Sequence, residues 1–259
     1  MSDVTPHFIF STKSYMAKQN SNKWMIATVA LSGVILGIAI GIGISQLPFF
    51  KARVNPGTAV VEQQKGANPL APPGVSSVPA VTAGDHVRGP ANAKITFIEY
   101  SDPECPYCKK FHESLVEITK AYPNDVRWVY RHYPIDSNHK KARNETEALE
   151  CAGSIGGESK FWEYLDRMMI VTPGNDRLPS EDLPKIAAFV KIDVNKFNTC
   201  LKSAPFAQKI QSQVTEAEQA GADGTPYTVL ITPDGKRYPI AGYVDVKSLT
   251  NAVNQILKS

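Results

Sequence analysis

The chain has 259 residues, of which 42% are hydrophobic and 20% are charged, and its formal net charge at pH 7 is +3. This balance is typical of a globular protein with room for one sizeable domain and additional segments. So small a positive charge, without a basic stripe that contains interleaved aromatic residues, argues against a nucleic-acid-binding protein.

The first predicted element is a membrane-spanning helix at residues 24–50. No charged residue interrupts this stretch, which follows Lys23 and precedes Lys51 and Arg53. At about 1.5 Å per residue, such a helix is long enough to cross the roughly 30 Å hydrocarbon core of a bilayer. The alternative is a cleaved signal peptide, but its apolar core would be shorter and would end at a small-residue cleavage site. We therefore expect an uncleaved anchor, and the lysines before it favour a cytoplasmic N-terminus.

The segments around this anchor have the composition of unstructured chain. Residues 1–23 are polar and lack apolar periodicity, which predicts a short cytoplasmic tail. Residues 51–84 are rich in Pro, Gly and Ala, which predicts a flexible linker. Within the anchor, Gly33, Gly37 and Gly41 recur every four residues, a spacing that would let two helices approach closely and form a homodimer. The alternative is that glycine is simply common in membrane helices.

The folded domain is expected at residues 85–259, with an alternation of strands and helices. Residues 93–100 form a β-branched and aromatic run that predicts a buried strand, and residues 106–122 have the three- and four-residue apolar spacing of a helix. The remaining predictions are a strand at 126–132, helices over 140–219, strands at 228–231 and 237–240 joined by an Asp-Gly turn, and a helix at 245–257. The order is β-α-β, a helical block, then β-β-α.

Cys105 and Cys108 lie where the first predicted strand meets the first predicted helix. The unpaired N–H groups of a helix N-terminus favour a thiolate, so the pKa of the Cys105 thiol should be lowered. Cys105 would be the exposed attacking sulfur, and Cys108 the buried one that resolves a mixed disulfide. Pro106 fits the first helical turn, where its missing N–H is not needed.

The Cys-x-x-Cys spacing is also compatible with two structural roles. A structural zinc site would need a second pair of ligands at matching spacing, and the remaining cysteines, Cys151 and Cys200, stand far apart in the sequence. The second structural role is a disulfide between Cys105 and Cys108 that serves only to stabilise the fold.

The sequence resembles the DsbA family of thioredoxin-fold thiol-disulfide oxidoreductases over roughly residues 85–259. The resemblance rests on three motifs in the family's order, which are SDPECPYCKKFHE after TFIEY, LECAGSIGGESKFWEYLDRMM together with FNTCLKSAPFA, and GTPYTVLITPDGKRYPIAG. It implies an α/β thioredoxin fold with an inserted helical domain at about residues 138–220. The element order derived from the residues themselves agrees with that fold.

The resemblance also implies roles for residues outside the cysteine pair. Thr225 and Pro226 match the family's cis-proline loop, which would place the Thr225 backbone beside the catalytic sulfurs; a plain turn is the alternative. Glu99 matches a buried acid that relays a proton to and from the resolving cysteine, whereas the alternative is an exposed carboxylate at a strand end. Asp102 and Glu104 lie next to the site and should limit how far the pKa of Cys105 falls.

The dipeptide between the cysteines departs from the best-known members of the family. Those proteins have Pro-His, in which the histidine stabilises the thiolate, whereas this chain has Pro106 and Tyr107. Tyrosine cannot carry the positive charge, so we predict a less oxidising couple than that of the Pro-His enzymes. Pro-Tyr is also the dipeptide of glutaredoxins, which work reductively.

Cys151 and Cys200 both fall in the helical block, 49 positions apart. In an exported domain, two leftover thiols are most simply paired, and a disulfide closing such a loop would stabilise the fold by about 3–4 kcal/mol. The alternatives are two unpaired buried thiols or a second redox pair.

Together these features predict a single-pass cytoplasmic-membrane protein whose catalytic domain lies on the periplasmic side. It would form disulfides in unfolded or reduced exported proteins by means of a redox-active Cys105–Cys108 disulfide, with no other cofactor, metal or nucleic acid. The resemblance implies a membrane quinone-linked thiol oxidase as the partner that reoxidises it. The alternatives are a disulfide reductase or isomerase of the same fold, and a peptide-binding module without catalysis.

Overall fold

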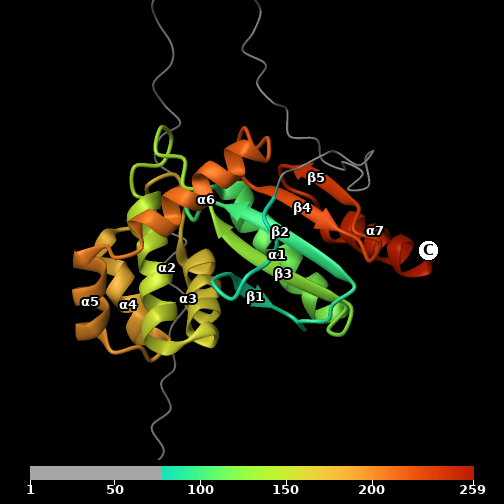
Figure 1. Cartoon of the computed structure of the whole chain (residues 1–259). Coiled ribbons are helices and arrows are strands. Elements are labelled where there is room, and N and C mark those ends of the chain that lie inside the picture. Colours follow the sequence, from blue (N-terminus) through green and yellow to red (C-terminus); the bar gives the residue numbers. More distant parts are fainter. Residues whose placement is uncertain (1–77) are drawn as a thin grey trace, which may run out of the picture. The chain divides into compact units, whose positions relative to one another are not determined.

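The computed structural model describes residues 78–259 (Figure 1). The predicted tail at 1–23, the span at 24–50 with Gly33, Gly37 and Gly41, and most of the linker at 51–84 lie outside the described residues. From residue 78 onward, no helix is both long enough and apolar enough to cross a membrane. The membrane anchor therefore stays a prediction.

A mixed sheet of five strands organises the described part of the chain, in the order β1-β3-β2-β4-β5. The strands are β1 (His86–Arg88), β2 (Ile95–Ser101), β3 (Val126–His132), β4 (Tyr227–Ile231) and β5 (Arg237–Ala241). β2 and β3 are parallel and are connected by helix α1 (Pro106–Ala121), whereas the other neighbouring pairs are antiparallel. This arrangement confirms the predicted thioredoxin-like α/β fold. The three-residue edge strand β1 was not predicted, because it is too short to show an alternating pattern.

The central strand β2 is buried along its whole length, which explains its β-branched and aromatic sequence. Successive side chains of a strand point to opposite faces. Ile95 and Phe97 accordingly join one apolar cluster with the buried face of α1, whereas Ile98 and Tyr100 join a second cluster on the other face of the sheet. Both faces of the sheet are thus covered, and the carboxyl end of β2 leads to the two cysteines.

The predicted helical block lies between β3 and β4. Its elements are α2 (Ala142–Gly156), α3 (Glu158–Val171), the 3-10 turn η1 (Ser180–Asp182), α4 (Leu183–Phe189), α5 (Val194–Ser203) and α6 (Ala207–Gln219). Figure 1 shows α2, α3, α4 and α5 gathered at one side of the sheet, and the last helix, α7 (Val246–Lys258), at the other side. This confirms the predicted helical insertion, which the helical apolar patterns of residues 140–219 had indicated.

The expected disulfide between Cys151 and Cys200 is present, and it connects α2 to α5 with an S–S distance of 2.03 Å. Cys151 is fully buried in the apolar core of the insertion. The bridge therefore ties together two helices of the block that are well separated in sequence.

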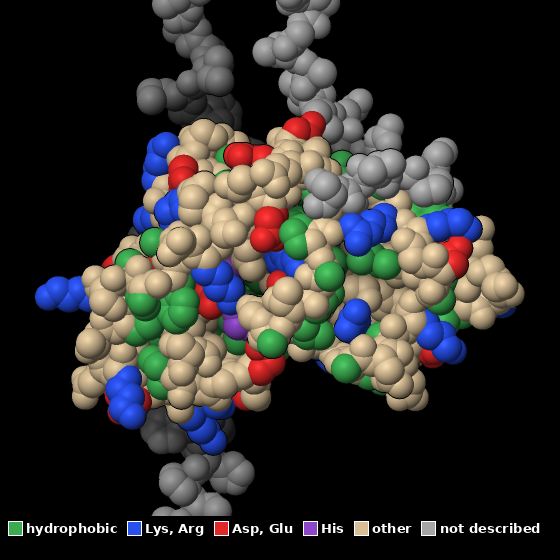
Figure 2. Space-filling model, viewed as in Figure 1, with side chains coloured by type: hydrophobic (Ala, Val, Ile, Leu, Met, Phe, Trp, Pro, Cys, Tyr) green, Lys and Arg blue, Asp and Glu red, His purple; other side chains and the backbone are tan. Residues whose placement is uncertain are grey.

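Figure 2 shows lysines, arginines and acidic residues interspersed with hydrophobic side chains over one face of the molecule. No broad surface of one sign of charge dominates this face. The view agrees with the small net charge of the chain and offers no track for a polyanion.

Candidate active site

The two cysteines lie at the start of α1, directly after the carboxyl end of β2. Cys105 is the N-cap residue, with an extended backbone at φ −76° and ψ 120°, and Pro106 occupies the first helical position. The main-chain N–H of Cys105 donates to the Asp102 carbonyl at 3.1 Å, which closes the turn between strand and helix. Both thiols are free; Cys105 is 7% exposed and Cys108 is completely buried. Only Cys105 can therefore meet a second protein without rearrangement.

The environment separates the pKa values of the two thiols. The pKa of Cys105 is lowered to about 6, chiefly because the Cys108 thiol donates a hydrogen bond to its sulfur, while burial opposes the shift. Contact with Thr225 and the main-chain N–H groups of Tyr107 and Cys108 lower it further. The pKa of Cys108 is raised well above its ordinary value, first by burial and then by the Cys105 partner. At neutral pH the pair is a thiolate at the surface and a thiol in the interior.

The peptide bond between Thr225 and Pro226 is cis, as the sequence predicted. The carbonyl oxygen of Thr225 lies 3.4 Å from the Sγ atom of Cys105. The Pro226 carbonyl accepts a hydrogen bond of 2.8 Å from Gly242 N–H, which holds the loop to the end of β5. Two segments that are 120 positions apart in the sequence thus meet at the reactive sulfur.

Glu99 lies inside the protein on β2 and is 0% exposed, so the alternative of an exposed strand end is wrong. Its Oε2 atom accepts a hydrogen bond from Trp128 Nε1 at 2.9 Å, whereas Oε1 has no partner among the described protein atoms. Burial raises the pKa of Glu99 to about 8, and the nearby charge of Cys105 contributes. Glu99 is therefore a neutral acid at pH 7, and the charge that it carries once ionised is among the causes that raise the pKa of Cys108.

Asp102 does lie beside the site, but its carboxylate has its own partners. Its Oδ1 atom accepts from Glu104 N at 2.8 Å, and its Oδ2 atom accepts from Ile135 N at 2.8 Å and pairs with His139 Nδ1 at 2.9 Å. The hydrogen bond to Asp102 raises the pKa of His139 to about 9. The Asp102 charge is thus compensated by an imidazolium, and it is the pKa of Cys108 that it raises. The Asp102 main-chain N–H donates to Cys108 Sγ at 3.4 Å.

Glu104 is also fully buried and is one half of an acid pair with Glu145 of α2. The Glu104 Oε2 atom accepts from Asp176 N at 2.6 Å. Burial, followed by the hydrogen bond and charge of Glu104, raises the pKa of Glu145 to about 10. Glu145 therefore keeps its proton at neutral pH.

His139 and Glu145 were not identified from the sequence. They belong to segments that follow β3, and no spacing relative to the cysteines marks them as neighbours of the motif. Nothing in the sequence distinguishes His139 from the other histidines or Glu145 from the other acidic residues, so neither could be assigned to the site.

The segment after α3 packs closely against the cysteine motif. Gly174 has a left-handed backbone with φ +72°, and a Cβ atom there would lie 3.0 Å from the Glu104 carbonyl and 3.3 Å from Pro106 Cγ. Lys109 Nζ donates to the carbonyls of Ile170 and Thr172 at 3.2 and 2.8 Å. These contacts set the helical insertion against the start of α1.

Exposed apolar side chains border the cysteines on this side. Tyr107 is 41% exposed and Ile170 is 68% exposed. A cleft of about 350 Å³ lies between α1 and α3, lined by His112, Glu113, Val116, Glu117, Lys120, Asp166, Met169 and Ile170. This cleft begins one turn beyond Cys108 on α1 and does not include either cysteine in its lining.

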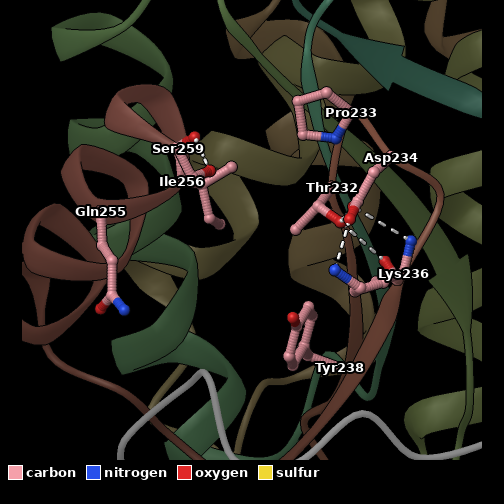
Figure 3. Close-up of a pocket in the computed structure, with 8 residues that line it drawn as sticks. All are labelled: Thr232, Pro233, Asp234, Lys236, Tyr238, Gln255, Ile256 and Ser259. Carbon is pink, nitrogen blue, oxygen red and sulfur yellow. Dashed lines mark hydrogen bonds and ion pairs between the residues drawn. The ribbon is translucent and has the colours of Figure 1, made fainter.

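A second pocket, of about 540 Å³, is remote from the cysteines (Figure 3). It opens between the β4–β5 turn and the end of α7, at the opposite end of β4 from Pro226. Its lining consists of Thr232, Pro233, Asp234, Lys236, Tyr238, Gln255, Ile256 and Ser259. Lys236 is paired with Asp234 across the turn, and no thiol or histidine lines the pocket. The redox chemistry therefore belongs to the other end of the sheet.

Comparison with known proteins places the chain among thioredoxin-fold proteins. A family model described as thioredoxin matches residues 81–254. Among solved structures, DsbA2 of Pseudomonas aeruginosa is 28% identical, with a TM-score of 0.59 over 70% of this chain and 98% of that chain. BdbD of Bacillus subtilis, in its oxidised form, is 21% identical, with a TM-score of 0.62 over 71% of this chain and 98% of that chain, which shows the shared fold.

The curated relatives that match this chain are longer proteins, named as Na(+)/H(+) antiporters. The chain is 34% identical over 176 residues to the Na(+)/H(+) antiporter NhaA 3 of Salinispora tropica, and 32% identical over 187 residues to NhaA of Nitrosospira multiformis. These matches cover 68% and 72% of this chain but 25% and 28% of those proteins. The chain thus spans about a quarter of the length of the curated relatives it matches.

Proposed function

The chain belongs to the DsbA-like family of thioredoxin-fold thiol-disulfide oxidoreductases, and from this we propose that it forms disulfides in exported proteins through Cys105 and Cys108. One observation carries the proposal. Cys105 is the slightly exposed thiolate at a helix N-terminus, 3.4 Å from the Thr225 carbonyl, whereas its partner thiol is completely buried. This pairing suits an exchange in which one sulfur meets the substrate and the other stays inside.

In the oxidase direction, the reaction begins with the Cys105–Cys108 disulfide. A substrate thiolate attacks Cys105 Sγ, a bond forms between the substrate sulfur and Cys105, and the electron pair of the broken S–S bond moves to Cys108. Cys108 then takes up a proton, as its raised pKa requires. A second substrate thiolate attacks the substrate sulfur of the mixed disulfide and releases Cys105 as a thiolate. The substrate has lost two electrons and gained a disulfide, and the enzyme is reduced.

Glu99 fits the role of the proton donor to Cys108. It is a neutral acid at pH 7 with a pKa of about 8, and it lies near enough to Cys108 to influence the pKa of that thiol. A buried acid of this pKa can give up a proton when the Cys108 thiolate forms and recover it when the disulfide is restored. Proton transfer from Glu99 to Cys108 is therefore part of the proposed mechanism.

The low pKa of Cys105 supports the oxidase direction of the proposal. A stabilised thiolate favours the reduced form of the enzyme, so substrate thiols tend to pass their electrons to it. Tyr107 supplies no positive charge, and its ring is partly exposed. This residue favours a less oxidising couple than a histidine would, so disulfide reduction or isomerisation is the second candidate function.

The proposed location is the outer face of a bacterial cytoplasmic membrane, behind an anchor at residues 24–50. The uncharged length of that segment supports it, and a Cys151–Cys200 bridge suits an oxidising compartment. A membrane thiol oxidase linked to quinone is the proposed source of oxidising equivalents, and reduced exported proteins are the proposed substrates.

The test is refolding of reduced ribonuclease by the oxidised full-length protein, followed by recovery of ribonuclease activity. Wild type should restore activity, and Cys105→Ser should not. Cys108→Ala, mixed in its reduced form with a peptide that contains a disulfide, should accumulate a mixed disulfide, because Cys105 attacks the peptide disulfide and no resolving thiol follows; non-reducing gels would detect it. Cys151→Ala/Cys200→Ala is the matched control, because it removes two cysteines without touching the site. Activity that survives in Cys105→Ser would refute the proposal.

The direction of electron flow has its own measurement. Equilibration of the Cys105–Cys108 pair with glutathione gives its reduction potential, and trapping of free thiols in cells gives its working state. A mostly oxidised pair supports the oxidase, and a mostly reduced pair supports the reductase or isomerase.

A further inference from the structure

A second cluster of ionisable side chains lies at the join between the sheet and the helical insertion, apart from the cysteine pair. It brings together His86 on β1, His132 at the end of β3 and Glu150 on α2. All three side chains are buried, and one potential ligand atom from each lies within 4.8 Å of the others. His86 and His132 are 64 and 18 positions from Glu150 in the sequence, so no short motif announces the group.

The donor atoms of these residues converge on one point. His132 Nε2 lies 2.7 Å from Glu150 Oε1, and His86 Nε2 lies 3.2 Å from the same oxygen. Around a tetrahedral Zn²⁺ ion with bonds of about 2.0–2.1 Å, neighbouring donors are roughly 3.3 Å apart. The two separations from Glu150 Oε1 are therefore close to those of a zinc site, and because all three donors lie within 4.8 Å of one another, shifts of the side chains would admit the ion.

The His86 ring is held in the orientation that a metal ligand needs, whereas His132 Nδ1 has no hydrogen-bond partner among the described residues. His86 Nδ1 lies 2.9 Å from Glu158 Oε2, so a hydrogen bond to this carboxylate turns Nε2 toward the cluster. The His86 ring stacks on Phe161 with centroids 3.4 Å apart and an interplanar angle of 4°. A carboxylate behind a ligating histidine is the usual arrangement of an outer ligand shell.

Lys209 of α6 now supplies the cation of the cluster. Its ammonium nitrogen lies 2.7 Å from Glu150 Oε1 and 3.3 Å from His86 Nε2, which is where a metal ion would have to sit. The Lys209 side chain is 29% exposed and lines a pocket of about 320 Å³. Because this side chain reaches the surface, it can swing outward into the pocket and leave the cluster.

The charges also favour exchange of a monovalent for a divalent cation. Glu150 and Glu158 bring two carboxylates to the cluster, and Lys209 brings one ammonium. When the ammonium leaves and the two Nε2 atoms give up the protons that they share with Glu150, two negative charges remain beside two imidazole nitrogens. A divalent ion that accepts nitrogen and oxygen donors balances this set, and Zn²⁺ is the common ion of that preference.

We propose that His86, His132 and Glu150 form a binding site for Zn²⁺, and that the ion enters by displacing the ammonium group of Lys209. The ion would join β1 and β3 to α2 and would leave its fourth position to water. The site involves no thiol and does not depend on the redox function of Cys105 and Cys108.

The experiment is a calorimetric titration of full-length protein with Zn²⁺, with the Cys105–Cys108 pair oxidised so that no active-site thiolate can bind the ion. Wild type should bind one ion, and Lys209→Met should bind it at least about tenfold more tightly, which corresponds to roughly 1.4 kcal/mol. Lys202→Met, on the neighbouring helix α5, is the matched control and should bind as wild type does.

Co²⁺ provides a readout that a purely structural ion pair would not produce. In Lys209→Met it should give the visible absorption of a tetrahedral complex with nitrogen and oxygen donors, and the signal should disappear in Lys209→Met/His86→Gln. Circular dichroism of each variant establishes that it is folded. Absence of stoichiometric binding in folded Lys209→Met, or binding that persists after His86→Gln, overturns the proposal and leaves the cluster as an ion pair alone.

Discussion

Replacement of Glu99 by glutamine should remove a large pH dependence from the stability of the protein. Burial raises the folded-state pKa of Glu99 from 4.5 to about 8. The folded state therefore holds a proton that the unfolded state loses above pH 4.5, so wild-type stability falls as pH rises between these two values. At about 1.36 kcal/mol per pH unit, the loss attributable to Glu99 between about pH 5.5 and pH 8 is about 3 kcal/mol.

The absolute effect of Glu99→Gln is less informative than its change with pH. The glutamine carbonyl can still accept from Trp128 Nε1, and its NH₂ group replaces a buried oxygen that already has no hydrogen-bond partner, so the substitution changes stability mainly through the lost titration. The free energy of unfolding of Glu99→Gln, relative to that of wild type, should increase by about 3 kcal/mol from about pH 5.5 to pH 8.

The assay is urea unfolding of the oxidised protein at a series of pH values, without reductant. The Cys105–Cys108 disulfide removes the titration of both thiols, and burial, the main cause of the Glu99 shift, remains. Glu117→Gln, on the exposed face of α1, is the matched control and should leave the pH dependence unchanged. If the stability curves of Glu99→Gln and wild type run parallel, Glu99 is already ionised in the folded protein and the reasoning is refuted.

Four further predictions concern the cysteines and their neighbours. In the reduced protein, alkylation of Cys105 by iodoacetamide should rise with a midpoint near pH 6, while Cys108 stays unmodified; a midpoint near 9 would contradict the assigned thiolate. His139→Gln should raise that midpoint by roughly half a pH unit, because it removes a cation that interacts with the charge of Cys105, and an unchanged midpoint would show that this cation has no influence. Tyr107→His should make the reduction potential of the pair less negative, as measured by equilibration with glutathione, since an imidazolium stabilises the thiolate. Cys151→Ala/Cys200→Ala should lower the free energy of unfolding by about 4 kcal/mol, for a loop of 49 residues, and leave disulfide exchange with a peptide at about 25 °C intact.

Local sequence was sufficient for the parts of this protein that depend on neighbours along the chain. The Cys-x-x-Cys spacing, the proline at the first helical turn and the apolar period of α1 all act within one strand and one helix. Their pattern predicted Cys105 at the helix N-terminus and Cys108 inside it, and the order of elements predicted the sheet with its helical insertion. The membrane anchor at residues 24–50 is also a prediction of this kind, and it lies outside the described residues.

Tertiary structure decided the features that depend on which distant groups meet. The family resemblance implied a buried Glu99 and a Thr225 backbone beside the sulfurs. The Trp128 partner of Glu99, 29 positions away, and the 3.4 Å contact of Thr225 with Cys105, across 120 positions, followed only from the packing of the sheet. The same holds for His139, which compensates Asp102, and for Lys209, which enters the His86 cluster from α6. A pKa depends on desolvation and on charges a few ångströms away, and neither quantity can be read from positions along the chain. Sequence therefore determined where the reactive sulfur is, and the fold determined what surrounds it.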